Sequence, residues 1–357
     1  MNRVRRSRRG SLLVVTLWLV TILSVLAVGV GRYLSTELRL TKYRLARERA
    51  KALARSGVYL GMQRLAEDVQ QQTGKPYDWL GDEYWAYPSR DNSEQPRVWI
   101  VDLLAEGQDV TALTGKITVE MQDEERRLTL NTEGHDPLLA IALKQLLADY
   151  PGIAEAIIDY QDSDDEGSDT GVVPPYVPKN GPIQAREELW ELPSVKQLEA
   201  SRLADLQRLL LQETTVSTTG TINMNTADEA VLRAILEPAA PSNPALAQAI
   251  LDFRWDPGET SDPAQGNRFV GLSPEVKTEG AGTLDQGVKD ALTQVMVGPL
   301  KDILSVQSTH FRIVSDGQTT NPRTTYRVTA IVERHATTEP MVELNGEKFH
   351  ILSWREG

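Results

Sequence analysis

The chain has no cysteine, which excludes disulfides, thiolate metal sites and cysteine nucleophiles. It has only four histidines, and none of them stands at the H-x-x-x-H spacing of a zinc-binding helix. Phosphate-binding glycine loops and the G-x-S-x-G nucleophile motif are also missing. Paired carboxylates for hydrolysis are the one catalytic pattern left, and they occur too often by chance to identify an enzyme. The sequence therefore predicts a protein without catalytic residues. We interpret the histidines as ordinary surface or strand residues, namely His135, His310, His335 and His350.

Negative charge dominates the chain except at its beginning. The net charge of the 357 residues is −12, and apolar residues make up 40%, as in ordinary globular proteins. Residues 1–9 contain five arginines and no acid, so the rest of the chain carries −17, five below the total. A body this acidic repels nucleic-acid phosphates and favours cations, including Ca²⁺, and basic partner surfaces. A chain of this length is expected to fold as two packed units with extensions.

The segment from Ser11 to Gly31 contains no charged residue. As a helix it would be about 31 Å long, which matches the hydrocarbon core of a bilayer. The arginines before it are expected to stay in the cytoplasm, which places the bulk of the chain on the other side. The sequence thus predicts a single-pass protein of the bacterial inner membrane with most of its residues in the periplasm.

A helical pattern continues beyond the apolar segment without a break. Leucines recur at roughly helical spacing among charged residues, and the first proline is Pro76. We expect one helix from Ser11 to about Val69, on the order of 90 Å long, with an apolar first half and an amphipathic second half. An ordinary secretory signal peptide would instead have a shorter apolar core followed by a small-residue cleavage site.

An arginine-rich leader that ends in glycine, followed by a long half-apolar helix, resembles the type IV pilin and pseudopilin superfamily. The resemblance implies that a prepilin peptidase cuts between Gly10 and Ser11, and that the new N-terminus is methylated. Most members have glutamate at the fifth mature position, where this chain has Val15. The family's glutamate compensates the N-terminal charge of the subunit above, so a subunit that caps the fibre does not need it. From the N-terminus alone, a plain signal anchor with a coincidental Gly10 is the alternative.

Strand-like alternation begins at Val98 and returns near the C-terminus. The early runs are VWIVDLL, KITVEMQDEE with Ile117, Val119 and Met121 on one face, and RLTLN. The late runs are HFRIVSDG, YRVTAIVERH and MVELNGEKFHILSW, in which Asn345-Gly346 is a strong two-residue hairpin signal. These runs predict a small antiparallel sheet packed on the long helix.

Between the two sets of strands, the pattern from Glu133 to about Leu300 is helical or irregular. One helical stripe there consists of Leu139, Ala142, Leu143, Leu146 and Leu147. We therefore expect an α+β fold in which a large all-α domain, of helix-hairpin-helix or SAM-like type, is inserted into the sheet domain. The expected parts are a leader (1–10), the transmembrane and pilin helix (11–72), the sheet domain (73–131 and 301–357) and the helical insert (132–300).

This layout resembles the K-type minor pseudopilins of the type II secretion system over nearly the whole chain. The matching segments are ITVEMQDEERRLTLN, IIDYQDSDDE, the stretch with Asn180, Glu188 and Leu189, INMNTADEAVL, and SVQSTHFRIVSDG. Two positions depart from the family's pattern: Arg127, where the family has a glycine-arginine pair, and Tyr160, where it has tryptophan. The resemblance implies a pseudopilus tip shared with I- and J-type minor pseudopilins, contact with the inner-membrane secretion platform and with membrane lipid, and a role in exporting folded proteins.

An acidic loop is the candidate metal site. Its carboxylates would repel one another if bare, and an oxygen-ligated cation such as Ca²⁺ would remove that repulsion. The spacing is not that of an EF-hand, and a solvated acidic loop is the alternative. The resemblance implies calcium in the folded periplasmic region without fixing its ligands, and Glu188 is a further candidate ligand. The loop residues are Asp159, Asp162, Asp164, Asp165, Glu166 and Asp169.

The segment INMNTADEAVLRAIL resembles the first half of a helix-hairpin-helix, with Asn225 or Thr226 expected to cap a helix that starts at Ala227. The glycine-rich hairpin that binds DNA backbones is missing, because PAAPSNP follows instead. We expect a structural unit and no nucleic-acid partner. The rival functions are a minor pilin of a type IV pilus and, from another class, a membrane-anchored nucleic-acid-binding protein.

Two further features lie on the long helix beyond its apolar half. Gly57 and Gly61 form a small-x-x-x-small pair, which either allows close helix approach or is simply tolerated near a helix end. The basic run from Arg39 to Arg55 is expected to form a solvated helix face, with lipid headgroups as its partner where it nears the membrane.

Overall fold

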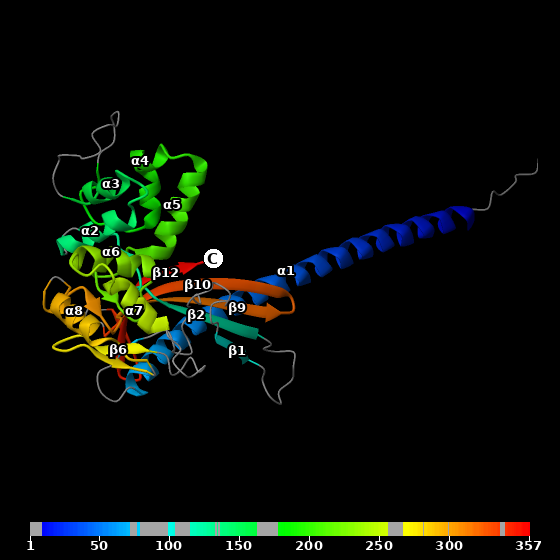
Figure 1. Ribbon diagram of the computed structural model, residues 1–357. Coiled ribbons are helices and arrows are strands. Elements are labelled where there is room, and N and C mark those ends of the chain that lie inside the picture. The colour runs from blue at the N-terminus through cyan, green and yellow to red at the C-terminus, as the bar shows by residue number, and fades with distance from the viewer. Residues whose placement is uncertain are drawn as a thin grey trace, which may run out of the picture.

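The structure, a computed structural model, describes most of the chain in several stretches. They are residues 9–71, 77–78, 99–103, 115–132, 134, 136–162, 178–255, 267–280, 282–298, 300–335 and 340–357. A long helix projects from the molecule, a sheet lies along its second half, and shorter helices gather beyond the far end of that sheet (Figure 1). This arrangement confirms the expected α+β class with a long N-terminal helix and an antiparallel sheet.

Helix α1 runs from Arg9 to Gln71, 63 residues, without interruption. Every residue from Leu13 to Leu45 is exposed, and Ala46 is the first buried one. In the part of the chain that the structure describes, one helix is long and apolar enough to cross a bilayer, and it is this one. Its second half is amphipathic as expected, because Ala50, Val58 and Leu65 face the sheet and are fully buried.

The main sheet has six strands in the order β1-β2-β9-β10-β12-β11, and every neighbouring pair is antiparallel. Ile117, Val119 and Met121 point to α1 as the alternation predicted. The strands are β1 (Trp99–Leu103), β2 (Gly115–Asp123), β9 (His310–Thr320), β10 (Arg323–Arg334), β11 (Met341–Leu344) and β12 (Glu347–Glu356). Since β2 and β9 are paired neighbours, the long segment between them leaves the sheet and returns to it at the same end.

The hairpin predicted at Asn345-Gly346 is present between β11 and β12. Both residues have positive φ, 51° at Asn345 and 82° at Gly346, as a type I′ turn requires. Asparagine and glycine tolerate this backbone conformation, so the local sequence alone is sufficient to fix this turn.

Glycines allow α1 to lie unusually close to its own sheet. A methyl group on Gly57 would lie 2.7 Å from Ile117 Cγ2, and one on Gly61 would lie 2.9 Å from Ile313 Cγ2. From the sheet side, a methyl group on Gly317 would lie 2.5 Å from the backbone nitrogen of Ala54. The small-residue pair on α1 therefore serves contact between helix and sheet, and not contact between two helices.

The described residues between β2 and β9 form a mainly helical region. Its helices are α2 (Pro137–Leu146), α3 (Ile153–Asp159), η1 (Arg186–Glu191), α4 (Pro193–Lys196), α5 (Ala200–Glu213), α6 (Glu229–Ala239), α7 (Leu246–Trp255) and α8 (Gln286–Val297). Its short strands pair as β3 (Leu128–Thr129) with β4 (Thr214–Thr215), β5 (Ile222–Asn223) with β8 (Leu304–Ser305), and β6 (Arg268–Gly271) with β7 (Lys277–Glu279). We call this region the helical insert.

Two predicted segments of the insert can be compared with the structure. The stripe on α2 is buried as expected at Leu139, Leu143 and Leu147, while Leu146 is partly buried. The RLTLN run does not join the main sheet. It turns away after β2, and Leu128 and Thr129 pair in parallel with Thr214 and Thr215 at the end of α5.

The apolar core is divided in two. One cluster lies between α1 and the main sheet and contains Phe311 and Phe349, and the other lies inside the insert and contains Leu143 and Phe269. Neither cluster includes the turn from Asp123 to Arg127 that connects sheet and insert, although every residue of that turn is buried. The connection between the two parts is consequently made by polar groups.

Candidate functional site

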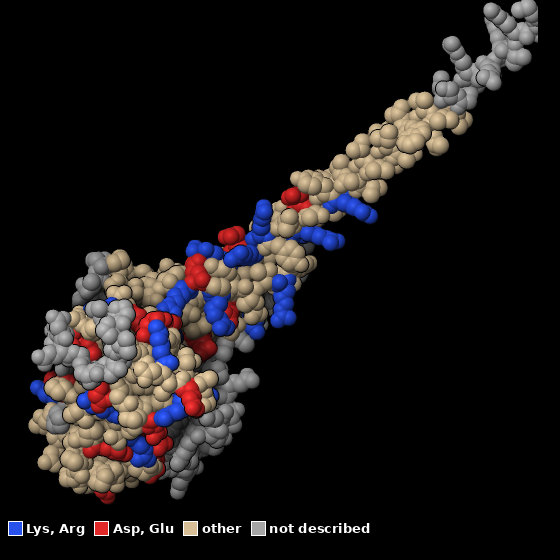
Figure 2. Space-filling view, turned by 90° about the horizontal axis from the view of Figure 1, so that it is seen from above, with Lys and Arg blue, Asp and Glu red and all other residues tan. Residues whose placement is uncertain are grey.

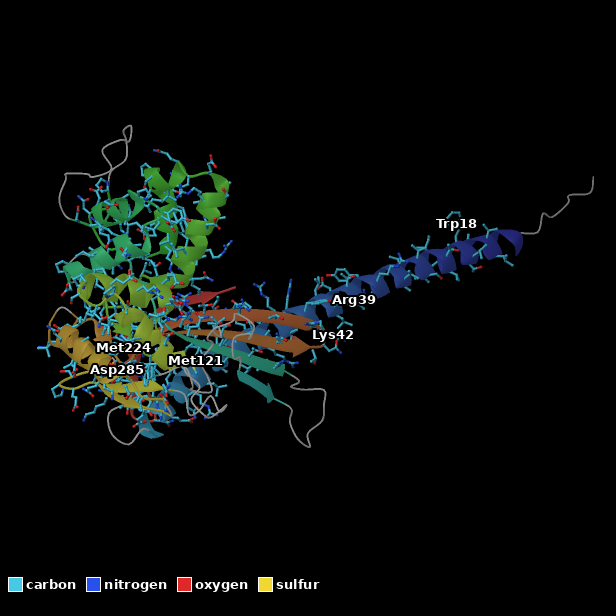
Figure 3. All side chains as sticks on the ribbon, in the orientation of Figure 1. Trp18, Arg39, Lys42, Met121, Met224 and Asp285 are labelled. Atoms are coloured by element: carbon cyan, nitrogen blue, oxygen red, sulfur yellow. The ribbon has the colours of Figure 1, made fainter. Side chains whose placement is uncertain are left out.

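The exposed half of α1 is the largest apolar surface among the described residues. Leu17, Trp18 and Val25 are 64–68% exposed, and Figure 3 shows Trp18 near the free end of the helix, far from the head. Val15 is 55% exposed on the same segment. A surface of this kind on one helix needs cover from lipid or from other apolar helices. Gly10 and Ser11 lie in the first turn of α1, and the Ser11 side chain is outside the described set.

The second candidate feature is the buried polar turn after β2, which we call the polar junction (residues 123–127). Oδ2 of Asp123 accepts hydrogen bonds from the hydroxyls of Thr226 and Ser308, at 2.5 and 2.6 Å. Its Oδ1 accepts from the backbone nitrogen of Glu125 at 2.8 Å. One carboxylate thus links the end of β2 to the segment that precedes α6 in the insert and to the segment that leads into β9.

The next two residues of the junction are also fixed by several partners. Glu124 contacts Arg127 at 2.8 Å, Arg312 at 2.5 Å and the Thr215 hydroxyl at 2.6 Å. Burial opposes ionisation of Glu124, but the charges of Arg127 and Arg312 outweigh it and lower its pKa to about 2. This carboxylate is therefore charged in the folded protein. Oε1 of Glu125 accepts from the backbone and the hydroxyl of Thr309.

A buried ion pair closes the junction from the side of β10. Arg334, 1% exposed, donates to Oδ2 of Asp78 and to the backbone oxygen of Ser308, both at 2.7 Å. Its guanidinium lies 4.7 Å from the ring centre of Phe311, and Asp68 near the end of α1 is 3.9 Å away. Arg334 thus connects α1, β10, Asp78 and the end of the insert.

Burial changes the protonation of two acids in this network. It raises the pKa of Asp123 to about 7, with the nearby charge of Glu125 acting in the same direction. Burial also raises the pKa of Asp78, against the opposing charge of Arg334. Every partner named here is a side chain or backbone group of the same chain, so the arrangement is suited to holding the insert rigidly on the sheet.

The sequence reasoning missed the polar junction and misassigned the residues on its insert side. Helix α6 begins at Glu229 with Asp228 as its N-cap, two residues later than expected. Asn225 instead exchanges two 2.8 Å hydrogen bonds with the backbone of Phe269, and Thr226 donates to Asp123. Buried tertiary partners outcompete a helix cap at both positions. The available signal was the charged run DEERR at the end of a predicted strand run.

The acidic loop is only partly described. Asp159 is buried at the end of α3, and Asp162 is half-buried after it. Asp164, Asp165, Glu166 and Asp169 lie outside the described residues. Within the described ranges, no group of three or more histidines and acids is arranged to hold a metal ion.

Glu188 already has partners for both of its carboxylate oxygens. Oε2 contacts Lys179 at 2.7 Å and the Tyr160 hydroxyl at 3.3 Å, and Oε1 accepts from the backbone nitrogens of Gln184 and Ala185. Burial raises the pKa of Glu188, but its bonds to Lys179 and to the two backbone nitrogens outweigh this effect and lower the pKa. This carboxylate does not fit a metal ligand in the described arrangement, because an ion would have to displace Lys179.

Comparisons with known proteins give a weak structural likeness. No family model matches the chain, and no curated protein matches it. A solved structure that is similar is a chain of the GspK-GspI-GspJ complex from the type 2 secretion system of enterotoxigenic Escherichia coli. The identity is 18%, the match covers 91% of this chain and 99% of that chain, and the TM-score is 0.47. This score is too low for the likeness to assign a function to the chain.

Proposed function

We propose that this chain is a minor pseudopilin of a type II secretion system and has a structural, non-catalytic role. It caps the tip of the periplasmic pseudopilus together with two other minor pseudopilins, of the I- and J-type, and supports the export of folded proteins. Its α1 anchors it in the inner membrane before assembly, and there it meets the prepilin peptidase and the secretion platform.

The observation that carries this proposal is the position of the helical insert. The exposed half of α1 leaves the sheet near Gly317, whereas the polar junction lies at the opposite end, near Asp68 at the end of α1. The insert therefore occupies the end of the head that is farthest from the exposed apolar half of α1 (Figure 1). In a fibre of parallel helices, the next subunit would have to stack on that end.

The sequence of the exposed half supports the same position. Val15 stands where most pilin-like chains resembling this one have a glutamate, and it lies on the uncovered apolar part of α1. A buried carboxylate without a partner is costly, so a subunit with nothing above it is better served by an apolar residue.

The apolar surface of α1 requires two environments in turn. Lipid covers it before assembly, and the apolar helices of the partner pseudopilins cover it afterwards. We also propose that the acidic loop around Asp162 binds calcium, which stabilises the insert. Glu188 is the least suited of the suggested calcium ligands because it already pairs with Lys179.

Mass spectrometry of the full-length protein purified from membranes of a cell with prepilin peptidase tests the proposal. We expect a mature chain that begins at methylated Ser11. A peptidase-deficient strain is the control and should yield the chain with Met1–Gly10 attached. A chain that keeps these ten residues in the peptidase-containing cell would contradict the proposal and would indicate a membrane-anchored protein unrelated to pseudopilins.

A further inference from the structure

A band of positive charge surrounds α1 between its apolar half and the head. From residue 32 to residue 49 there are six basic side chains and two acidic ones, a net charge of +4 within a mature chain that is otherwise strongly acidic. All eight are exposed, and Figure 2 shows the basic side chains of this band along the helix. The basic residues are Arg32, Arg39, Lys42, Arg44, Arg47 and Arg49.

The charges of the band are not neutralised within the chain. In the described part of the molecule, the first ion pairs along α1 are made by Lys51 and Arg55, which contact Glu356 at 2.8 and 2.7 Å. None of the six basic residues before them takes part in an ion pair with a described residue. The net positive charge of this band on a bare helix favours an anionic partner from outside the chain.

Four of these residues lie next to the apolar span, and we call Arg32, Arg39, Lys42 and Arg44 the collar. At 1.5 Å per residue they lie within about 20 Å of Gly31 along the helix axis. Side chains of a helix lean toward its N-terminus, so the long collar side chains reach back toward the apolar span. Figure 3 places Arg39 and Lys42 where α1 leaves the sheet.

The distribution of the collar around the helix separates two kinds of partner. At roughly 100° per residue, the four side chains cover roughly 200° of the circumference. A single acidic helix would need basic residues along one stripe, whereas lipid headgroups surround a helix on all sides. Tyr33 and Tyr43 are 65% and 57% exposed among these charges, as expected of aromatic residues at a membrane interface.

We propose that the collar binds the headgroups of anionic phospholipids in the leaflet that faces the head. This binding sets the depth of α1 and holds the acidic head at the membrane against its own repulsion from an anionic surface. The inference rests on the membrane placement of α1 in the proposed function, and not on the tip position. Arg47 and Arg49 lie about 24 and 27 Å from Gly31 along the helix axis, farther from the headgroups than any collar residue, and contribute less.

The absence of cysteine makes a direct test practical, because a single introduced cysteine carries a spin label without competition. Full-length protein labelled at Ser35→Cys is placed in nanodiscs of phosphatidylcholine alone or mixed with phosphatidylglycerol. A Ser24→Cys label, in the middle of the apolar span, reports insertion. The test variant replaces the four collar residues by glutamine, which keeps helix propensity, and the matched control replaces Arg47 and Arg49 by glutamine.

We expect phosphatidylglycerol to immobilise the Ser35 label in the wild type and in the matched control, at low salt and less at high salt. The collar variant should show no dependence on lipid. Native mass spectrometry of the detergent-purified protein should show several-fold more bound phosphatidylglycerol on the wild type than on the collar variant. The largest difference expected is roughly fivefold for each collar residue replaced.

Three results would overturn the inference. The first is an equal response of the collar variant and the wild type to phosphatidylglycerol. The second is a matched control whose response to phosphatidylglycerol falls as much as that of the collar variant. The third is a Ser24 label that is not embedded in lipid. Only the last result also contradicts the membrane placement in the proposed function, so the two failures are distinguishable.

Discussion

Gly317 of β9 lies directly against the backbone of Ala50 on α1, so closely that a methyl group on Gly317 would overlap the Ala50 carbonyl oxygen. The same methyl group would lie 2.5 Å from the backbone nitrogen of Ala54 and 2.8 Å from Leu53 Cβ. Backbone atoms of a helix cannot move aside individually. The close approach of the long helix to its sheet at this point thus requires that residue 317 has no side chain.

Gly317→Ala should destabilise the head by about 1–3 kcal/mol or more, because the added methyl group forces α1 away from the sheet. Denaturant unfolding of the full-length protein in detergent measures this change. Gly271→Ala is the matched control, since its methyl group would be 3.8 Å from the nearest atom, Lys277 Cβ. Equal stability of the two variants would contradict the close helix–sheet contact.

Arg334→Met should cost about 3–5 kcal/mol of unfolding free energy, because it leaves Asp78 buried without its ion-pair partner. Adding Asp78→Asn to this variant should recover part of the loss, and a double-mutant cycle measures the coupling. Arg327→Met on the same strand is the control, since Arg327 is 62% exposed in its pair with Asp316 and should lose at most about 1 kcal/mol. Additive effects of Arg334→Met and Asp78→Asn would show that the buried ion pair between these residues does not contribute to stability.

The stability of the head should fall as the pH rises from about 4 to about 7. Asp123 has a folded pKa of about 7, above its ordinary value of 3.8, so its contribution is complete below that lower value and is lost as the pH rises through 7. Each such group lowers the unfolding free energy by about 1.4 kcal/mol per pH unit in this window. Glu213 acts in the same direction, because burial and the charge of Asp228 raise its pKa to about 7.

Asp123→Asn should therefore reduce the slope of stability against pH between 4 and 7, and the double variant with Glu213→Gln should reduce it further. Chemical unfolding at several pH values gives the slopes. Glu124 titrates in a different window: its pKa of about 2 means that its contribution is present above about 4.5 and is lost as the pH falls through 2. An unchanged slope in Asp123→Asn would show that this carboxyl is ionised throughout.

Val15→Glu should leave secretion close to the wild-type level, because a capping subunit has no subunit above it whose N-terminus the glutamate would meet. Secreted enzyme activity in a strain complemented with the variant measures this. The control is Val15→Leu, which keeps the apolar character of the position. Loss of secretion in Val15→Glu alone, with normal expression and processing, would argue against the tip position.

Calcium should raise the melting temperature of the protein, and EDTA should lower it, because a cation relieves the repulsion in the acidic loop. Asp162→Asn should reduce this response. Glu188→Gln should keep it, since both oxygens of Glu188 already have partners within the chain. Thermal unfolding with and without the ion decides between these outcomes, and a melting temperature that neither reagent changes would leave a solvated acidic loop.

Much of the fold follows from local patterns in the sequence. The uncharged run from Ser11 and the helical spacing beyond it predict α1, the alternation around Val119 predicts β2, and Asn345-Gly346 predicts the last hairpin. Each of these signals is contained within a few neighbouring residues, where backbone sterics and the period of the side chains are sufficient.

The junction was decided only by the tertiary structure. Asp123 meets Thr226 and Ser308, which are 103 and 185 residues away along the chain, and Arg334 meets Asp78 across 256 residues. No local period records such pairings, and a polar residue in a sequence looks the same whether it is solvated or buried. Local sequence patterns are sufficient for the long helix, for the main strands and for the last hairpin. The buried hydrogen bonds that hold the insert on the sheet depend on folding, because only the folded chain removes these groups from water and brings their partners together.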